Sequence, residues 1–262
     1  MFLRSQPAGS YSVATKFNPM APQHHGKTDL ATVEAAVDAS LKRLGLPCID
    51  LYYAHRMPPT LEGLLEWMRA CKTLVAKGKV KSVGLSEVSP SWLREAHKVH
   101  PVAAIQMEWS LFSRSIEDHP APVCKELKVA IVAYSPLARN LLAQPQEEVH
   151  AGDWRAMHPR FTAENRKRNG ELTAQIAAMA KAKGKSAAQL SLGWLYCRAE
   201  QLGVTVVPIP GTTKLEHAMD NWGALDIKLS AAEMLKLEEL GKLVAGPRGD
   251  ERYMKASFEQ RL

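Results

Sequence analysis

Polar side chains capable of acid–base chemistry occur where apolar runs of this sequence end. Lys16 lies near the end of SVATKF, His55 ends IDLYYAH, and Tyr134 lies near the end of AIVAYS. Lysine, histidine and tyrosine can each bind or release a proton at a reacting group, so this series could support general acid–base catalysis. One such residue alone is more often a solvated charge or a hydrogen-bonded structural group. The argument therefore depends on their regular recurrence.

The apolar runs alternate with helical patterns. Strands are predicted over six ranges: 12–17, 49–55, 81–86, 103–109, 130–135 and 205–210. Helices are predicted over about 29–44 and 60–78, after Ser89–Pro90, through 123–127, in two patterns that follow a long polar stretch at about 138–169, and near 214–221 and 230–242. Ser186 and Gln189 form a capping box that opens the second of those two patterns.

This alternation indicates a parallel sheet, either doubly wound or closed into a barrel. No GxGxxG motif follows a strand, which weighs against a dinucleotide-binding Rossmann fold. In a (β/α) barrel the carboxyl ends of all strands converge on one mouth, where active sites are built. Polar residues occupy all six of the predicted strand ends: Lys16, His55, Ser86–Glu87, Gln106, Tyr134–Ser135 and Gly211–Thr212.

Composition limits the class of protein. The chain has 262 residues, 46% hydrophobic and 23% charged, and we expect one domain over residues 1–262. No apolar run approaches the roughly 20 residues that span a bilayer, so no membrane partner is expected. The N-terminus has no signal-peptide core, which predicts a cytoplasmic protein, although its basic composition also fits a trimmed transit peptide. The cysteines form no CxxC pair, which predicts free thiols and no metal site: Cys48, Cys71, Cys124 and Cys197.

The net charge of +7 fits either a nucleic-acid partner or an anionic small ligand. The most basic stretch, RFTAENRKRNG, lacks the interleaved aromatic residues of a nucleic-acid surface. We therefore expect no nucleic-acid partner.

Seven strings of the sequence, taken together, resemble the aldo-keto reductase family in order and spacing, from about residue 12 to 253. They are VATKF, LKRLGLPCIDLYYAHR, GLSE, QMEWSLFSR, IVAYSPLARNLL, PRFTAEN and PIPGTTKLEHAMDN. The resemblance is greatest to members that carry GLSE and PGTTK. It implies an α/β fold of the (β/α)8 TIM-barrel type, and NADPH-dependent reduction of a small-molecule carbonyl compound to an alcohol.

The resemblance also implies catalytic roles for two residues. Lys16 matches the lysine that lowers the pKa of a tyrosine acid, and His55 matches the histidine that orients the carbonyl group. These roles are physically reasonable, because a developing oxyanion needs preorganised donors. A phenol with a pKa near 10 needs a nearby cation to act near neutral pH.

A site for NADP(H) is implied by the same resemblance. Ser86 and Gln106 match positions that hold the nicotinamide carboxamide, and Tyr134 matches the ring that stacks on the nicotinamide. The loop along the pyrophosphate is matched by Ser135, Leu137 and Arg139. Residues at a helix start, where free N–H groups favour phosphate, are Gly211, Thr212, Thr213 and Lys214.

Three residues near that helix start refine the expected cofactor. Lys214 adds the charge expected for a 2′-phosphate, which favours NADP over NAD, and Asn221 matches an adenine contact. His217 lies where many relatives have arginine. A weaker or pH-dependent affinity for phosphate is therefore expected.

The sequence departs from the family upstream of the lysine strand. The family's catalytic aspartate and tyrosine lie there, but residues 1–11 contain no Asp and are too short for two βα units of about 30 residues each. Tyr11 lies at the wrong end of its strand. The expected fold is thus a barrel truncated to about six strand–helix units without that Asp/Tyr pair.

Truncation would leave two strand edges open, at 12–17 and at 205–210, where Pro208 and Pro210 blunt the second edge. Self-association through the first edge is one expected consequence. Lys16 would also lack its carboxylate partner, and a partly buried, unpaired lysine should have a lowered pKa.

Three classes of function fit these features. The first is an NADPH-dependent carbonyl reductase, impaired by the absence of the Asp/Tyr pair. The second is an inactive NADPH-binding or regulatory protein, and the third is an interaction protein that completes its barrel with another chain. The sequence does not identify the substrate.

Overall fold

A computed structural model of the chain describes residues 6–7, 9–143, 149–150 and 152–262. The chain divides into two compact units, which we describe separately. Unit 1 comprises Met1–Gln106, Glu126–Ala130 and Ala256–Leu262, and unit 2 comprises Met107–Lys125 and Ile131–Lys255. The expectation of a single domain stays a prediction.

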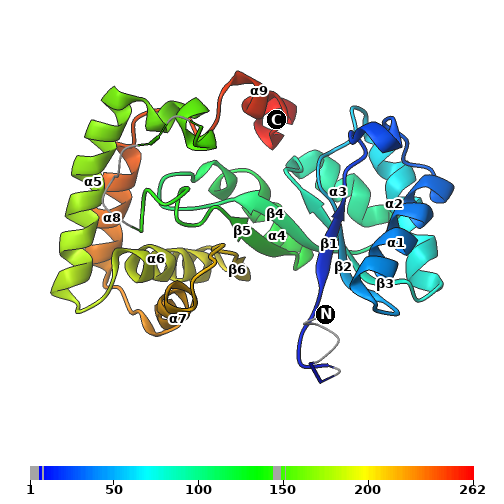
Figure 1. The fold of residues 1–262 in the computed structure, drawn as a ribbon, viewed down its shortest axis with the longest axis horizontal. Helices are drawn as coiled ribbons and strands as arrows, with labels where there is room; N and C mark the ends of the chain where they lie inside the picture. The colour runs from blue at the N-terminus through cyan, green and yellow to red at the C-terminus, as the bar shows by residue number, and fades with distance from the viewer. Residues whose placement is uncertain (1–5, 8, 144–148, 151) are drawn as a thin grey trace. The chain divides into compact units, whose positions relative to one another are not determined.

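Unit 1 is built on parallel strands that follow one another in chain order. The strands are β1 (Ala14–Phe17), β2 (Ile49–Ala54), β3 (Val80–Ser86) and β4 (Val102–Glu108), whose last two residues belong to unit 2. The connecting helices are α1 (Leu30–Leu44), α2 (Leu61–Ala76) and α3 (Pro90–Val99). Figure 1 shows α1 and α2 beside these strands, and α1 contacts β1 while α2 contacts β3.

Local capping signals explain where these helices begin. The side chain of Asp29 accepts a hydrogen bond from the Thr32 amide, and α1 starts directly after it. Ser89 caps α3 in the same way, with Pro90 as the first helical residue. Both residues satisfy amides that a helix N-terminus leaves unpaired. At the other end of α1, Gly45 adopts φ 67, the left-handed conformation that commonly ends a helix.

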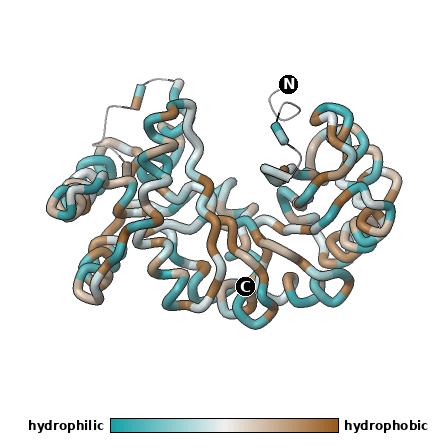
Figure 2. The backbone as a smooth tube through the Cα atoms, turned by 90° about the horizontal axis from the view of Figure 1, so that it is seen from below, coloured by the Kyte–Doolittle hydropathy of each residue, from teal (hydrophilic) through white to brown (hydrophobic). Residues whose placement is uncertain are grey.

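The second half of the chain carries the strands β5 (Ala130–Tyr134) and β6 (Val206–Pro208), which pair in parallel. The helices are α4 (Pro120–Leu127), α5 (Ala163–Ala182), α6 (Ala187–Leu202), α7 (Leu215–Trp222), α8 (Ala231–Lys242) and α9 (Glu251–Lys255). Ser186 and Gln189 form the expected capping box of α6. Apolar residues recur along the helices in Figure 2, and those of α6 include buried Leu190 and Trp194.

Two predicted ranges need correction. The irregular stretch ends at Thr162 rather than at residue 169, because the Thr162 side chain accepts a hydrogen bond from the Asn165 amide and starts α5. The strand predicted over 205–210 is shorter, Val206–Pro208. Proline has no N–H to donate to a ladder, so Pro208 and Pro210 limit its length.

The fold class expected from the sequence is confirmed. Within the described residues, six parallel strands alternate with helices, as in the (β/α)8 TIM-barrel type. In the described ranges, none of the helices has both the length and the apolarity that crossing a membrane requires.

Candidate functional site

One row of side chains crosses the sheet of unit 1 from β1 to β4. Lys16 pairs in register with Tyr53, Tyr53 with Gly84, and Gly84 with Ala104. Residues paired in register point to the same face of a sheet. In agreement, the Lys16 Nζ lies 5.9 Å from the centroid of the Tyr53 ring. This face is opposite to the one covered by helices, where Tyr52 stacks on Trp67 of α2.

Gly84 makes room for the ring of Tyr53. A Cβ atom at Gly84 would lie 2.4 Å from the Tyr53 ring, so no other residue fits without a shift of that ring. Tyr53 is 1% exposed, and its hydroxyl has no hydrogen-bond partner within the described parts of the chain. Burial raises the pKa of Tyr53 well above its usual value. The Tyr53 side chain is thus a buried, uncharged neighbour of Lys16.

A second row lies one step nearer the carboxyl ends of the strands. His55 follows Tyr53 by two residues and Ser86 follows Gly84 by two, so both point to the same face as the first row. Ser86 pairs in register with Gln106, and its hydroxyl donates to the Gln106 carbonyl at 3.0 Å. Ser86 and Gln106 are both buried. Four residues predicted from the sequence, Lys16, His55, Ser86 and Gln106, are therefore brought to one face of unit 1.

Lys16 lies on β1, the end strand of the sheet, where its side chain is exposed to solvent on one side. Neighbouring atoms partly desolvate its ammonium group and lower its pKa, which is the direction expected. Lys16 makes no ion pair among the described residues. The pKa of His55 is also lowered, first by desolvation and then by the positive charges of Arg56 and Lys16.

Glu87 has a structural role and is not part of the candidate site. Its side chain is fully buried, its φ is 54, and its Oε2 accepts a hydrogen bond from the Phe258 amide at 3.3 Å. Glu87 therefore holds the C-terminal segment of unit 1. The sequence suggested a polar strand end here but gave no sign of this contact.

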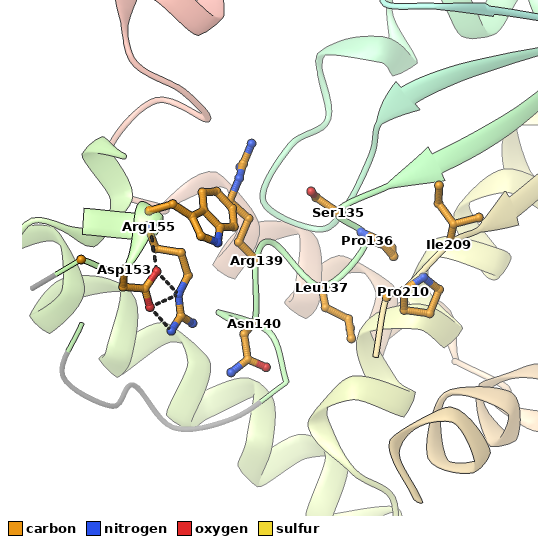
Figure 3. A pocket seen from close by; sticks show the side chains of 12 residues that line it. Ser135, Pro136, Leu137, Arg139, Asn140, Asp153, Arg155, Ile209 and Pro210 are labelled. Carbon is orange, nitrogen blue, oxygen red and sulfur yellow. Dashed lines mark hydrogen bonds and ion pairs between the residues drawn. The ribbon is translucent and has the colours of Figure 1, made fainter. Parts of the chain in front are cut away.

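In unit 2 the loop after β5 has an unusual backbone. Ala138, Arg139 and Asn140 adopt φ values of 49, 56 and 78, a left-handed turn without glycine. Together with Gly211, this loop lines a pocket of about 800 Å³. Figure 3 shows the pocket with the labelled side chains of the loop. Ser135, Leu137 and Arg139, three predicted cofactor residues, all belong to its lining. Tyr134 precedes the loop and does not line the pocket.

Charged side chains cluster around Glu108 beside this loop. The buried carboxylate of Glu108 accepts hydrogen bonds from Arg139 at 3.1 Å and from Arg248 at 3.2 Å. Arg160 is linked to Glu108 through Ser113. The Ser113 hydroxyl accepts a hydrogen bond from Arg160 and donates one to Glu108. Burial lowers the pKa of Arg160 to about 10, which still leaves it charged at neutral pH. Three guanidinium groups thus gather around the Glu108 carboxylate, and Arg139 among them lines the pocket.

A second, smaller pocket of about 100 Å³ lies beside α7. Leu137, Gly211, Thr212, His217 and Asn221 are among the residues that line it. Thr213 and Lys214 belong to neither pocket lining and are exposed at the start of α7. The Lys214 Nζ lies 3.8 Å from the Glu216 carboxylate, so part of its charge is already matched.

Sequence reasoning missed Glu108, Arg248 and Tyr253. The Tyr253 hydroxyl donates to Glu108 at 2.9 Å, and its oxygen lies 2.6 Å from that of Tyr134. The available signals were a glutamate near the end of a mainly apolar strand and the string GDERY near the end of the chain.

Comparison with known proteins gives a consistent result. The Aldo/keto reductase family profile matches residues 2–242. The solved aldo-keto reductase from Klebsiella pneumoniae in complex with NADPH is 26% identical, with a TM-score of 0.65 over 91% of this chain and 72% of that one.

Two further structures have the same fold. The glycerol dehydrogenase from Gluconobacter oxydans is 24% identical, with a TM-score of 0.75 over 84% of this chain and 67% of that chain. A thermostable aldo-keto reductase in complex with epalrestat is 24% identical, with a TM-score of 0.71 over 91% and 74%. On the extent of the family match, the chain belongs to the aldo/keto reductase family.

Proposed function

We propose that this chain is an NADP(H)-dependent oxidoreductase that reduces the carbonyl group of an aldehyde or ketone to an alcohol. The observation that carries the proposal is the common face of Lys16, His55, Ser86 and Gln106 in unit 1. It places a cation and an imidazole in the same face as two buried polar residues.

Each residue of this face has a distinct proposed role. The cofactor, when bound, supplies the hydride to the carbonyl carbon. Ser86 and Gln106 hold the nicotinamide carboxamide, and His55 orients the carbonyl oxygen. Lys16 stabilises the negative charge that develops on that oxygen, because a cation without a competing ion pair is available to do so.

The residues of unit 2 fit the remainder of the cofactor. Arg139 lines the same pocket as Ser135 and Leu137, where its guanidinium group favours a pyrophosphate. Gly211, Thr212, Thr213, Lys214 and Asn221 are proposed to bind the 2′-phosphate and adenine. A fluorescence titration with NADPH tests this assignment directly.

The preference for NADPH over NADH is tested at Lys214. Lys214→Ala should weaken NADPH by about 1 kcal/mol, or about fivefold, since the group is exposed and partly matched by Glu216. NADH affinity should stay unchanged. Lys242→Ala, an exposed lysine in α8, is the control. Equal losses for both cofactors in Lys214→Ala would remove the basis for this preference.

Among the residues of this face, His55 is the proposed proton donor to the carbonyl oxygen. A general acid typically contributes roughly 10²–10⁴-fold in rate. Desolvation lowers the pKa of His55, so the rate of carbonyl reduction by this route should rise as pH falls below about 6.5, the ordinary pKa of histidine.

A carbonyl-reduction assay distinguishes the alternatives. Activity that rises at acid pH and disappears in His55→Ala supports reduction by this route. NADPH binding without turnover at any pH supports an inactive NADPH-binding or regulatory protein. Rapid turnover that is indifferent to His55→Ala shows that another group donates the proton.

We also propose that a second copy of the chain covers the edge of β1. Val13 and Phe17 accept hydrogen bonds from Leu51 and His55, so alternate residues have their backbone groups directed toward β2. Ala14 and Lys16 therefore direct theirs away from β2, to the side on which the described residues place no further strand. Ala14→Pro removes one outward N–H and should reduce self-association in light scattering, whereas Ala14→Val should not. Equal association of both variants would show that this edge is not the contact.

A further inference from the structure

Tyr134 ends β5, and its hydroxyl is tied to a residue far away in the chain. Its oxygen lies 2.6 Å from the oxygen of Tyr253, which belongs to the short helix α9. Tyr253 in turn donates to the Glu108 carboxylate at 2.9 Å. Both contacts lie within unit 2. Neither α9 nor Tyr253 has a role in the proposed function described so far.

The direction of these hydrogen bonds follows from the number of protons. A phenol carries one hydrogen, and an ionised carboxylate can only accept. Because Tyr253 uses its hydrogen on Glu108, Tyr134 must be the donor to Tyr253. The Arg248 guanidinium group also donates to both hydroxyl oxygens. Its Nη1 lies 3.3 Å from the Tyr134 oxygen and 3.4 Å from the Tyr253 oxygen. The chain of hydrogen bonds runs from Tyr134 through Tyr253 to Glu108.

This series of hydrogen bonds ends at Glu108, whose carboxylate is held in place by ion pairs. The Glu108 side chain is 0% exposed and is paired with Arg139 and Arg248. The same two guanidinium groups lie over the Tyr253 ring, with their central carbons 5.4 and 5.3 Å from its centroid. Tyr253 therefore contacts both Tyr134 and Arg139, through its hydroxyl and its ring respectively.

We propose that Tyr253 is a positioning residue, which fixes the Tyr134 ring and the Arg139 guanidinium in the orientations that receive the nicotinamide and the pyrophosphate. The inference rests on the proposed function and extends it to α9. Holding a binding group in place before the ligand arrives removes the entropy cost of ordering it on binding. Loss of the Tyr253 hydroxyl removes this one contact of the Tyr134 hydroxyl, while Arg139 keeps its ion pair with Glu108.

The experiment compares two ligands in Tyr253→Phe. This variant keeps the ring and its contacts with Arg139 and Arg248 but removes the hydroxyl. NADPH should bind about three- to tenfold more weakly, the factor expected for the loss of one ordinary hydrogen bond. Adenosine 2′,5′-bisphosphate, which lacks both the nicotinamide and the pyrophosphate, should bind unchanged. Tyr196→Phe, on α6 and outside this network, should leave both affinities unchanged.

A double-mutant cycle supplies a second measurement. If Tyr253 acts through Tyr134, then Tyr134→Phe and the double variant should weaken NADPH equally, so the two substitutions are not additive. Unchanged NADPH affinity in Tyr253→Phe, an equal loss for both ligands, or additive effects would overturn the positioning role. A wild-type chain that binds neither ligand would instead overturn the proposed function, and this role with it.

Discussion

Lys16 and Arg139 are both cations with proposed roles in one reaction, but their surroundings are opposite. Lys16 in unit 1 is exposed and makes no ion pair among the described residues. The Arg139 side chain in unit 2 is 6% exposed and donates twice to a fully buried carboxylate. The first arrangement leaves a charge available, and the second fixes a charge in place.

The difference has a physical cause. A buried ion pair loses its hydration, so removal of one partner leaves an uncompensated charge and is strongly destabilising. A more exposed cation keeps more of its hydration, so its removal costs less. Unit 1 can thus present groups whose protonation changes, whereas unit 2 holds charged groups whose geometry does not.

The largest expected effect is at the anchor of unit 2. Glu108→Gln leaves Arg139, Arg248 and the nearby Arg160 without their carboxylate, and should lower the free energy of unfolding by roughly 3–5 kcal/mol. Lys16→Met in unit 1 should change it by less than about 0.5 kcal/mol. Urea unfolding measures both. Similar losses in the two variants would contradict the contrast between the units.

A second prediction concerns the Tyr53 ring beside Lys16. Gly84→Ala would place a Cβ 2.4 Å from the Tyr53 ring and should cost roughly 1–3 kcal/mol of stability through overpacking. Gly170 in α5 is a matched control, because its Cβ would meet nothing within 4 Å. Gly170→Ala should stabilise the chain by roughly 0.5–1 kcal/mol. Effects of the same sign in thermal unfolding would show that Tyr53 moves aside.

A third prediction sharpens the description of the unit 2 loop. Ala138 has φ 49, a conformation that costs an L-residue about 1–2 kcal/mol and glycine almost nothing. After the greater entropy of glycine in the unfolded chain is subtracted, Ala138→Gly should stabilise by roughly 0.5–1 kcal/mol. Arg139→Gly relieves the same strain but breaks the buried pair, and should destabilise. Denaturant midpoints distinguish the two signs.

The smallest expected effect is a pH dependence in unit 1. The folded-state pKa of His55 is lowered from 6.5, so the unfolded state binds the proton more readily. Stability should therefore decrease as pH falls from about 6.5 through the folded pKa, and should be unaffected by His55 above that range. His55→Gln should remove this component of the pH profile. A profile identical in wild type and His55→Gln would show that the environment of His55 does not shift its pKa.

The sequence determined the features that depend on neighbours a few residues apart. Asp29, Ser89 and Ser186 start helices where capping predicts, because each bonds an amide three residues along. The alternation of apolar runs and helical periods fixed the parallel α/β class. Strand register then places His55 and Ser86 on one face, since side chains alternate along every strand.

Only the tertiary structure decided the features that join distant residues. Tyr253 reaches Glu108 across 145 positions, and Phe258 reaches Glu87 across 171, with no local pattern to indicate either contact. The exposure of Lys16 was likewise undetermined, because it depends on which strand lies at the end of the sheet. Capping and periodicity act within a few residues, whereas burial and ion pairing depend on which distant segments the folded chain brings into contact.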